Sequence, residues 1–145
     1  MEYNDTAVFD FSPQQVFDVV ADIENYPRFL PGWISARIID KQQNKMTVEQ
    51  ELGFTFLHWR FTSQAIFEPP LHLHISSHKG HFFHLEIDWS FSAVEDNKTR
   101  VSLVAKADSP PGPQQRFLQG MLSGTTRSLL NCFEERIKNV YSAND

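Results

Sequence analysis

The sequence of 145 residues has one cysteine, Cys132, and no long apolar run. A single cysteine excludes an internal disulfide and a cysteine-based metal site, and it favours a reducing compartment. No stretch approaches the roughly 18–20 apolar residues that a membrane-spanning helix needs. Residues 1–5 are acidic and lack the basic start and apolar core of a signal peptide. We therefore expect a cytoplasmic protein.

Positive charge is also scarce. The 13 lysines and arginines are outnumbered by 18 acidic residues, which gives a net charge of −5. The basic residues are scattered and form no dense run of the kind that binds nucleic acid. No glycine-rich phosphate loop is present. We expect no DNA partner, although a local basic patch is not excluded.

Aromatic and apolar residues are abundant, because 41% of the chain is hydrophobic and 13 residues are phenylalanine. This composition predicts a single domain, residues 1–145, around one core. Apolar spacing predicts one helix of about 28 residues from the Pro113 corner to Tyr141, roughly 40 Å long. Period-two alternation predicts an antiparallel sheet whose apolar face the long helix crosses, which is an α+β fold. The predicted strands cover residues 3–10, 33–40, 45–56, a continuation that ends at Glu68, a hairpin over 71–93, and 99–107.

Two short helices are predicted after the first strand. Ser12 can cap the first helix, Pro13 suits its first position, and Gln15 can complete a capping box. The second turn is stopped by Pro27 and Pro31. Beside these breakers lies an apolar bend that covers either the core alone or a ligand cavity, and it carries Tyr26, Phe29, Leu30 and Trp33.

The hairpin over residues 71–93 can be tested by register. A two-residue turn would place the apolar residues of its two strands on opposite faces, because a slip of one residue flips every side chain. A three-residue loop, 79–81, puts Leu71, Leu73 and Ile75 on the same face as Phe83, Leu85, Ile87, Trp89 and Phe91. The same register predicts two cross-strand pairs on the solvent face, His74 with Glu86 and His72 with Asp88.

The ionisable residues do not form an evident metal or catalytic site. The spacing of His72 and His74 suits a metal site, but the register pairs both with carboxylates at the solvent face, and zinc would need a third ligand. The acidic residues fall on wet faces, and no nucleophilic triad can be assembled. The polar residues whose strand parity points inward include Gln50 and Ser63. We predict no metal ligand and no catalytic residue.

The predicted helix has two interior glycines, Gly120 and Gly124, which cost about 1 kcal/mol each relative to alanine. They are either tolerated surface residues or a bendable gate beside a cavity. The inner face of the sheet is rich in large aromatic residues. That richness indicates either a plain core or a concave apolar space that binds a ligand, and the pattern alone leaves both open.

Residues 16–33, VFDVVADIENYPRFLPGW, closely resemble the opening signature of the coenzyme Q-binding START-like family, within the START and polyketide-cyclase superfamily. Further similarity follows in chain order. It includes the break at Glu68–Pro70, the strand with Gly80, Phe83, Leu85, Trp89 and Phe91, and the closing helix with Phe133, Glu134, Arg136 and Tyr141. The opening motif reads Pro31-Gly32-Trp33, where the family often has proline, tryptophan and cysteine. The resemblance implies a helix-grip fold, a curved antiparallel sheet around a long C-terminal helix.

The resemblance also implies a function. The quinone branch binds ubiquinone, and we expect a carrier or chaperone for a ubiquinone-like or lipid-like ligand with no other cofactor. A similar branch acts as a ribosome-association toxin, which makes contact with the ribosome the alternative. A polyketide cyclase or dehydrase comes third, and transient contact with a membrane surface stays open. The expected ligand-binding residues are Tyr26, Phe29, Leu30, Trp33, Phe54, Phe56, Trp59, Phe61, Phe83, Leu85, Trp89, Leu118, Leu122 and Leu129.

Overall fold

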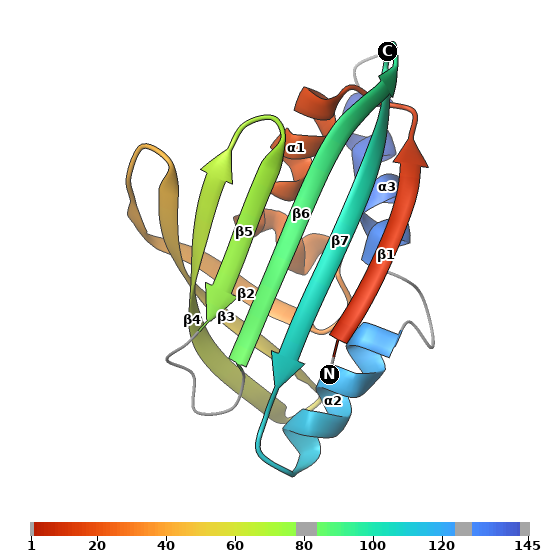
Figure 1. The fold of residues 1–145 in the computed structure, drawn as a ribbon. Helices are drawn as coiled ribbons and strands as arrows, with labels where there is room; N and C mark the ends of the chain where they lie inside the picture. The colour runs from red at the N-terminus through yellow and green to blue at the C-terminus, as the bar shows by residue number, and fades with distance from the viewer. Residues whose placement is uncertain (1, 78–83, 124–128, 143–145) are drawn as a thin grey trace.

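The structure, a computed structural model, describes residues 2–77, 84–123 and 129–142, with backbone only for 121–123. Its centre is a seven-stranded antiparallel sheet in the order β1-β7-β6-β5-β4-β3-β2 (Figure 1). The strands are β1 (Glu2–Phe9), β2 (Trp33–Lys41), β3 (Lys45–Phe54), β4 (Leu57–Glu68), β5 (His72–Ser77), β6 (His84–Glu95) and β7 (Lys98–Asp108). The helical elements are α1 (Pro13–Val20), the 3₁₀ helix η1 (Ile23–Arg28), α2 (Pro113–Ser123) and α3 (Leu129–Ser142).

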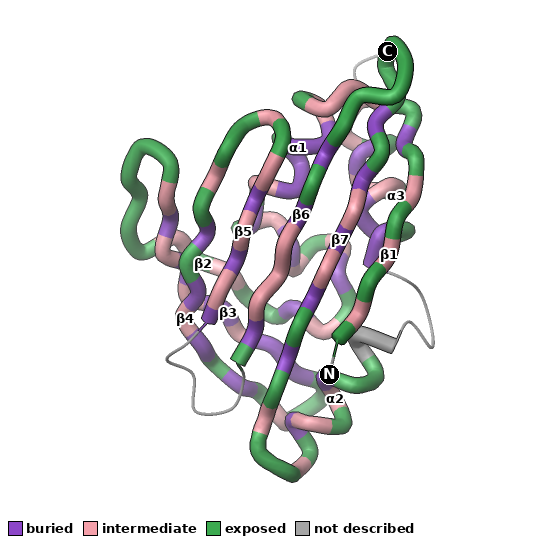
Figure 2. The backbone as a smooth tube through the Cα atoms, viewed as in Figure 1, coloured by how far each residue is buried: buried purple, intermediate pink, exposed green. Residues whose placement is uncertain are grey.

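The helices cover one face of the sheet, and Figure 1 shows α1 and α3 behind the strands. Helix α1 contacts α3, β6 and β7, whereas η1 packs on β2 and α2 contacts β1 and β7. Buried and exposed residues alternate along the strands (Figure 2). This alternation gives the sheet one packed face and one wet face. The predicted helix-grip architecture is confirmed.

The first helix begins as its sequence predicts. The Gln15 backbone N–H donates to Ser12 Oγ at 3.2 Å, and the Ser12 backbone N–H donates to Gln15 Oε1 at 3.0 Å. This reciprocal pair satisfies two N–H groups that the first turn would otherwise leave unpaired. The helix then directs Phe17 against the rings of Phe67 and Phe91, at centroid distances of 6.3 and 6.0 Å.

The register of the β5–β6 hairpin differs from the prediction by two residues. His74 pairs with Asp88, and His72 pairs with Ser90. A shift of two keeps every side chain on its predicted face, so the face assignment of Leu73 and Ile75 holds while the individual pairs were wrong. Asp88 contacts both histidines: its Oδ1 lies 2.6 Å from His74 Nδ1 and 3.5 Å from His72 Nε2. The loop residues themselves, 78–83, lie outside the described part.

Two further predictions need correction. Strand β3 ends at Phe54, and Thr55 takes a left-handed backbone with φ of 47°. The chain reverses there, which removes Phe56 from the strand alternation and leaves it 87% exposed, so its predicted place on the inner face was wrong. Leu71 likewise precedes β5 and is exposed. The C-terminal helical region is described as α2 and α3. Residues 124–128 between them lie outside the described residues, so one continuous helix stays a prediction.

Candidate ligand-binding site

A small cavity lies on the inner face of the sheet. Its volume of about 20 Å³ has room for about one water-sized group. Its walls come from η1 and from five adjacent strands, β2 to β6. The lining residues are Tyr26, Trp33, Gln50, Phe61, Ser63, Ile75, Leu85 and Ile87. Most are apolar, so Gln50 and Ser63 are the points at which the wall can make directed contacts.

A row of hydrogen bonds crosses this wall. The indole Nε1–H of Trp33 donates to Gln50 Oε1 at 2.8 Å, and Gln50 Nε2 donates to Ser63 Oγ at 2.6 Å. Gln50 and Ser63 are 4% and 1% exposed. Both side chains point inward, as parity predicted. Their mutual bonding explains how uncharged polar groups are tolerated there, because a buried polar group without a partner is costly.

Tyr26 bounds the cavity on the helix side, and its ring belongs to a cluster of aromatic contacts. The ring of Tyr26 packs edge-on against Trp33 and Phe133, at centroid distances of 6.1 and 5.3 Å. Phe133 of α3 in turn packs edge-on against Phe29 at 5.1 Å and Trp89 at 4.8 Å. Such edge-to-face pairs are favourable aromatic geometries. The bend after α1 is thereby joined to the C-terminal helix through one shared phenylalanine.

Tyr26 is held in place by a polar contact as well. Its hydroxyl donates to the backbone carbonyl of Val20. Burial, with a smaller contribution from Asp22, raises the pKa of Tyr26 well above its ordinary value. The ring therefore stays neutral at physiological pH. Gly32 at the end of the bend adopts φ of +86°, which strains any other residue, and a Cβ there would lie 2.7 Å from the Phe117 ring and require that ring to shift.

The predicted ligand-binding residues occupy different places. Those that line the cavity are Tyr26, Trp33, Phe61 and Leu85. Buried in the surrounding core are Leu30, Trp59, Trp89, Leu118 and Leu129, and Phe29 is half-buried. Phe54 lies at the strand end, 46% exposed and stacked on Phe117 at 5.8 Å, and Phe56 is in the exposed turn. Phe83 and the side chain of Leu122 lie outside the described residues.

The predicted set omitted several residues of the cavity. Ile75 and Ile87 were placed on the inner face but not at the cavity, and Gln50 and Ser63 were recognised as inward without a role. Phe133, in the apolar stripe of the last helix, does not line the cavity but packs against Tyr26, which does. Inward parity combined with polarity was the one sequence signal that could have selected Gln50 and Ser63.

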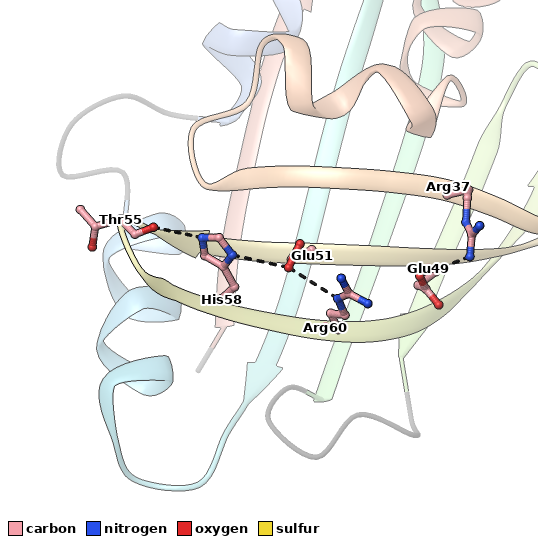
Figure 3. A network of polar contacts seen from close by, with 6 residues as sticks. All are labelled: Arg37, Glu49, Glu51, Thr55, His58 and Arg60. Carbon is pink, nitrogen blue, oxygen red and sulfur yellow. Dashed lines mark hydrogen bonds and ion pairs between the residues drawn. The ribbon is translucent and has the colours of Figure 1, made fainter.

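The outer face of the same strands carries charge (Figure 3). Glu51 Oε1 lies 3.5 Å from both His58 Nδ1 and Arg60 Nε, while Glu49 Oε1 lies 3.5 Å from Arg37 Nη2. The arginine side chains are 71–74% exposed, and pairs in such positions contribute little to stability. These residues form a solvated surface opposite the cavity.

Two observations concern metals and membranes. Within residues 2–77, 84–123 and 129–142, no three His, Cys, Asp or Glu side chains gather closely enough to hold a metal ion. His78 and His81 fall outside that range. Among the described helices, none combines the length and the hydropathy needed to cross a bilayer.

Similar proteins bear on the identity of this fold. The ribosome association toxin RatA of Pseudomonas aeruginosa is 22% identical over 136 residues, 94% of either chain. The mitochondrial coenzyme Q-binding protein COQ10 homolog B of Xenopus laevis is 31% identical over 93 residues, which are 63% of this chain and 38% of that protein. A START superfamily protein from Mycobacterium smegmatis has the same fold, with a TM-score of 0.76 at 16% identity, over 96% of this chain and 98% of the other.

The family itself follows from a match that spans most of the chain. The profile of a family described as polyketide cyclase/dehydrase and lipid transport covers residues 9–134. The match begins at the end of β1 and runs into α3, so it includes every residue that lines the cavity. The resemblance inferred from the bend and the closing helix is confirmed, and the chain belongs to the polyketide cyclase/dehydrase and lipid transport family, with a START-like fold.

Proposed function

We propose that this protein binds a hydrophobic ligand of the ubiquinone or lipid type between the sheet and the C-terminal helices, and acts as a carrier or chaperone in quinone-related processes of the cytoplasm. The observation that carries this function is the apolar cavity with a neutral polar row in its wall. The similarity to a coenzyme Q-binding protein supports the ligand class.

The binding energy would come mainly from apolar burial. At about 25 cal/mol per Å², a ligand that buries about 300 Å² gains about 7 kcal/mol before its ordering costs. The cavity of about 20 Å³ holds only one small group, so a larger ligand requires the surrounding rings to move. Of the residues in the wall, Tyr26 comes from a helical element. Its ring packs against Phe133, which in turn packs against Phe29.

The first test is direct. The purified protein is extracted with organic solvent, and the extract is analysed by mass spectrometry for quinones and lipids. In parallel, a ubiquinone with one isoprenoid unit is titrated into the ligand-free protein while tryptophan emission is recorded. Because Trp33 lines the cavity, a quinone bound there should quench its emission in a saturable manner.

A blocking variant locates the site. Ile87 lines the cavity and is only half-buried, so Ile87→Phe can narrow the cavity at modest cost in stability. Ile66→Phe on β4, at a 40% exposed position, is the matched control. Ile87→Phe should weaken quinone binding at least tenfold and Ile66→Phe should not. Trp89→Ala is a poorer choice, because Trp89 packs on Phe133 and its loss costs about 3–5 kcal/mol. If both variants bound the quinone with the same affinity, the binding site would have to lie outside this cavity.

The second candidate function is an interaction with the ribosome. It is favoured by the similarity to ribosome association toxins, which extends over 94% of this chain. Such a contact would use exposed basic side chains, among which Arg37 and Arg60 lie on the outer face. Co-sedimentation with isolated ribosomal subunits that weakens with salt, and weakens further in Arg37→Glu/Arg60→Glu, would favour this function. Co-sedimentation that Ile87→Phe abolishes would instead tie it to the cavity.

A further inference from the structure

The polar row on the inner wall has a fixed direction. An indole N–H can only donate, so the atom of Gln50 that faces Trp33 is its carbonyl oxygen. This contact assigns the orientation of the Gln50 amide and turns its NH₂ group toward Ser63. Ser63 Oγ therefore accepts, and its own O–H hydrogen is left to donate. No acceptor for that hydrogen lies among the residues that the structure describes.

A second hydroxyl lies beyond Ser63 in the same row. Ser77 follows Leu73 and Ile75 on the inner face of β5 and is 1% exposed. Its Oγ has no hydrogen-bond partner within the described ranges. A hydroxyl buried in this way has lost its hydrogen bonds to water without replacement, which destabilises the folded protein. Among the described residues, no other buried side-chain oxygen or nitrogen lacks a hydrogen-bond partner.

The two hydroxyls belong to neighbouring positions. Strand β4 pairs with β5 up to Gln64 and Ser76, and one further step of this register sets Ser63 across from Ser77. Side chains directly opposite in an antiparallel pair have Cβ atoms about 4.5–5.5 Å apart. One oxygen atom between them is then within reach of both O–H groups. Ser63 lines the cavity, and so does Leu85, the partner of Ser77 in β6.

From this arrangement we infer that Ser63 and Ser77 form a two-donor site for one carbonyl oxygen of the hydrophobic ligand. The inference rests on the proposed function and specifies its ligand as a carbonyl-bearing molecule, a quinone or a ketone, that enters carbonyl first. The cavity of about 20 Å³ matches a single oxygen-sized group. An acceptor at this point recovers the hydrogen bonds that both hydroxyls lack, whereas a hydrocarbon does not.

The experiment compares three probes by calorimetry. They are a ubiquinone with one isoprenoid unit, the matched benzene derivative in which both carbonyls are absent, and the methyl ketone 2-undecanone. The test variant is Ser77→Ala, which removes an unpartnered group and so should keep or raise the melting temperature. The control is Ser76→Ala, at the preceding position, where the side chain lies on the outward-facing side of β5.

Wild-type protein should prefer the quinone to its carbonyl-free analogue. Ser77→Ala should lose about threefold to tenfold in quinone affinity, the loss of one neutral hydrogen bond, and bind the analogue unchanged. Infrared spectra should show one quinone C=O band at lowered frequency in the wild type, shifted back in Ser77→Ala. Loss of affinity for 2-undecanone as well assigns the site to carbonyls in general, and loss for the quinone alone assigns it to a quinone.

Three results would overturn the inference, and the first two differ in what they mean for the proposed function. If the quinone and its analogue bind the wild type equally and Ser77→Ala changes neither, the cavity binds ligands without this donor pair, and the proposed function survives. If no probe binds the wild type, the proposed function fails together with the inference. Equal weakening in Ser76→Ala and Ser77→Ala would also contradict a specific role for Ser77.

Discussion

The two faces of strands β3 and β4 handle polar residues in opposite ways. On the outer face, Glu49 and Glu51 are paired with arginine side chains that are 71–74% exposed and with a histidine side chain that is 42% exposed. On the inner face, Gln50 between them is buried and bonded to Trp33 and Ser63 by neutral hydrogen bonds. Along three consecutive residues, the outer two belong to a solvated charge network and the middle one belongs to the buried row of hydrogen bonds.

The difference lies in what each arrangement can contribute. Exposed ion pairs gain little, since water solvates each partner nearly as well. Buried neutral groups must be bonded, because an unmade bond in the interior is costly. The inner row therefore matters more for stability than the outer one, although it has no formal charge. At its end, the Ser77 hydroxyl has no partner in the described part of the chain, which lowers the stability of the protein, and the proposed ligand would supply the missing hydrogen bond.

The largest effect is expected from breaking the inner row. Gln50→Leu retains the side-chain volume but leaves Trp33 Nε1–H without an acceptor and Ser63 without a donor. Two buried groups lose partners, so the free energy of unfolding should fall by about 2–4 kcal/mol. Urea unfolding monitored by circular dichroism measures the change. A loss below 0.5 kcal/mol would mean that water replaces the missing amide.

A smaller effect of opposite sign is expected at the end of the row. Ser77→Ala removes a buried hydroxyl that has no partner in the described part of the chain. The free energy of unfolding of the ligand-free protein should rise by about 1 kcal/mol. The same urea assay, with Ser76→Ala as the reference, measures it. A stability loss as large as 1 kcal/mol would show that the Ser77 hydroxyl has a partner in solution.

The smallest effect is expected on the outer face. Glu49→Gln removes the ion pair with Arg37, and the side chains of both residues are substantially exposed. The free energy of unfolding should change by less than about 0.5 kcal/mol, and the difference should vanish at 1 M salt. Thermal unfolding at low and high salt measures both. An effect as large as that of Gln50→Leu would remove the contrast between the two faces.

Much of this organisation could be predicted from the sequence. The Ser12 capping box, the strand alternation and the inward direction of Gln50 and Ser63 all follow from local chemistry and parity. The β5–β6 register was missed by two residues, because a shift of two keeps every residue on its face and alternation cannot detect it. Phe56 was misplaced because the residue with the left-handed backbone is Thr55 and not a glycine, so the sequence did not indicate a turn at that position.

The site was harder to predict than the fold. Tyr26, Trp33, Phe61 and Leu85 were expected to be near a ligand, and all four line the cavity. The pattern could not separate them from Leu30 or Trp89, which fill the core beside it. All of these residues are apolar and turned inward, and only their packing distinguishes a filled position from the wall of a space.

The sequence by itself determined the family, the order of the elements and which side of each strand is buried, because these depend on local propensity and on the period of the apolar residues. Only the tertiary structure decided that a Trp33–Gln50–Ser63 row forms and that Ser77 lies at its end without a partner in the described chain. The four residues come from four different strands, β2 to β5. Hydrogen bonds between them depend on the registers of those strands, and alternation along a single strand fixes a face but not a neighbour.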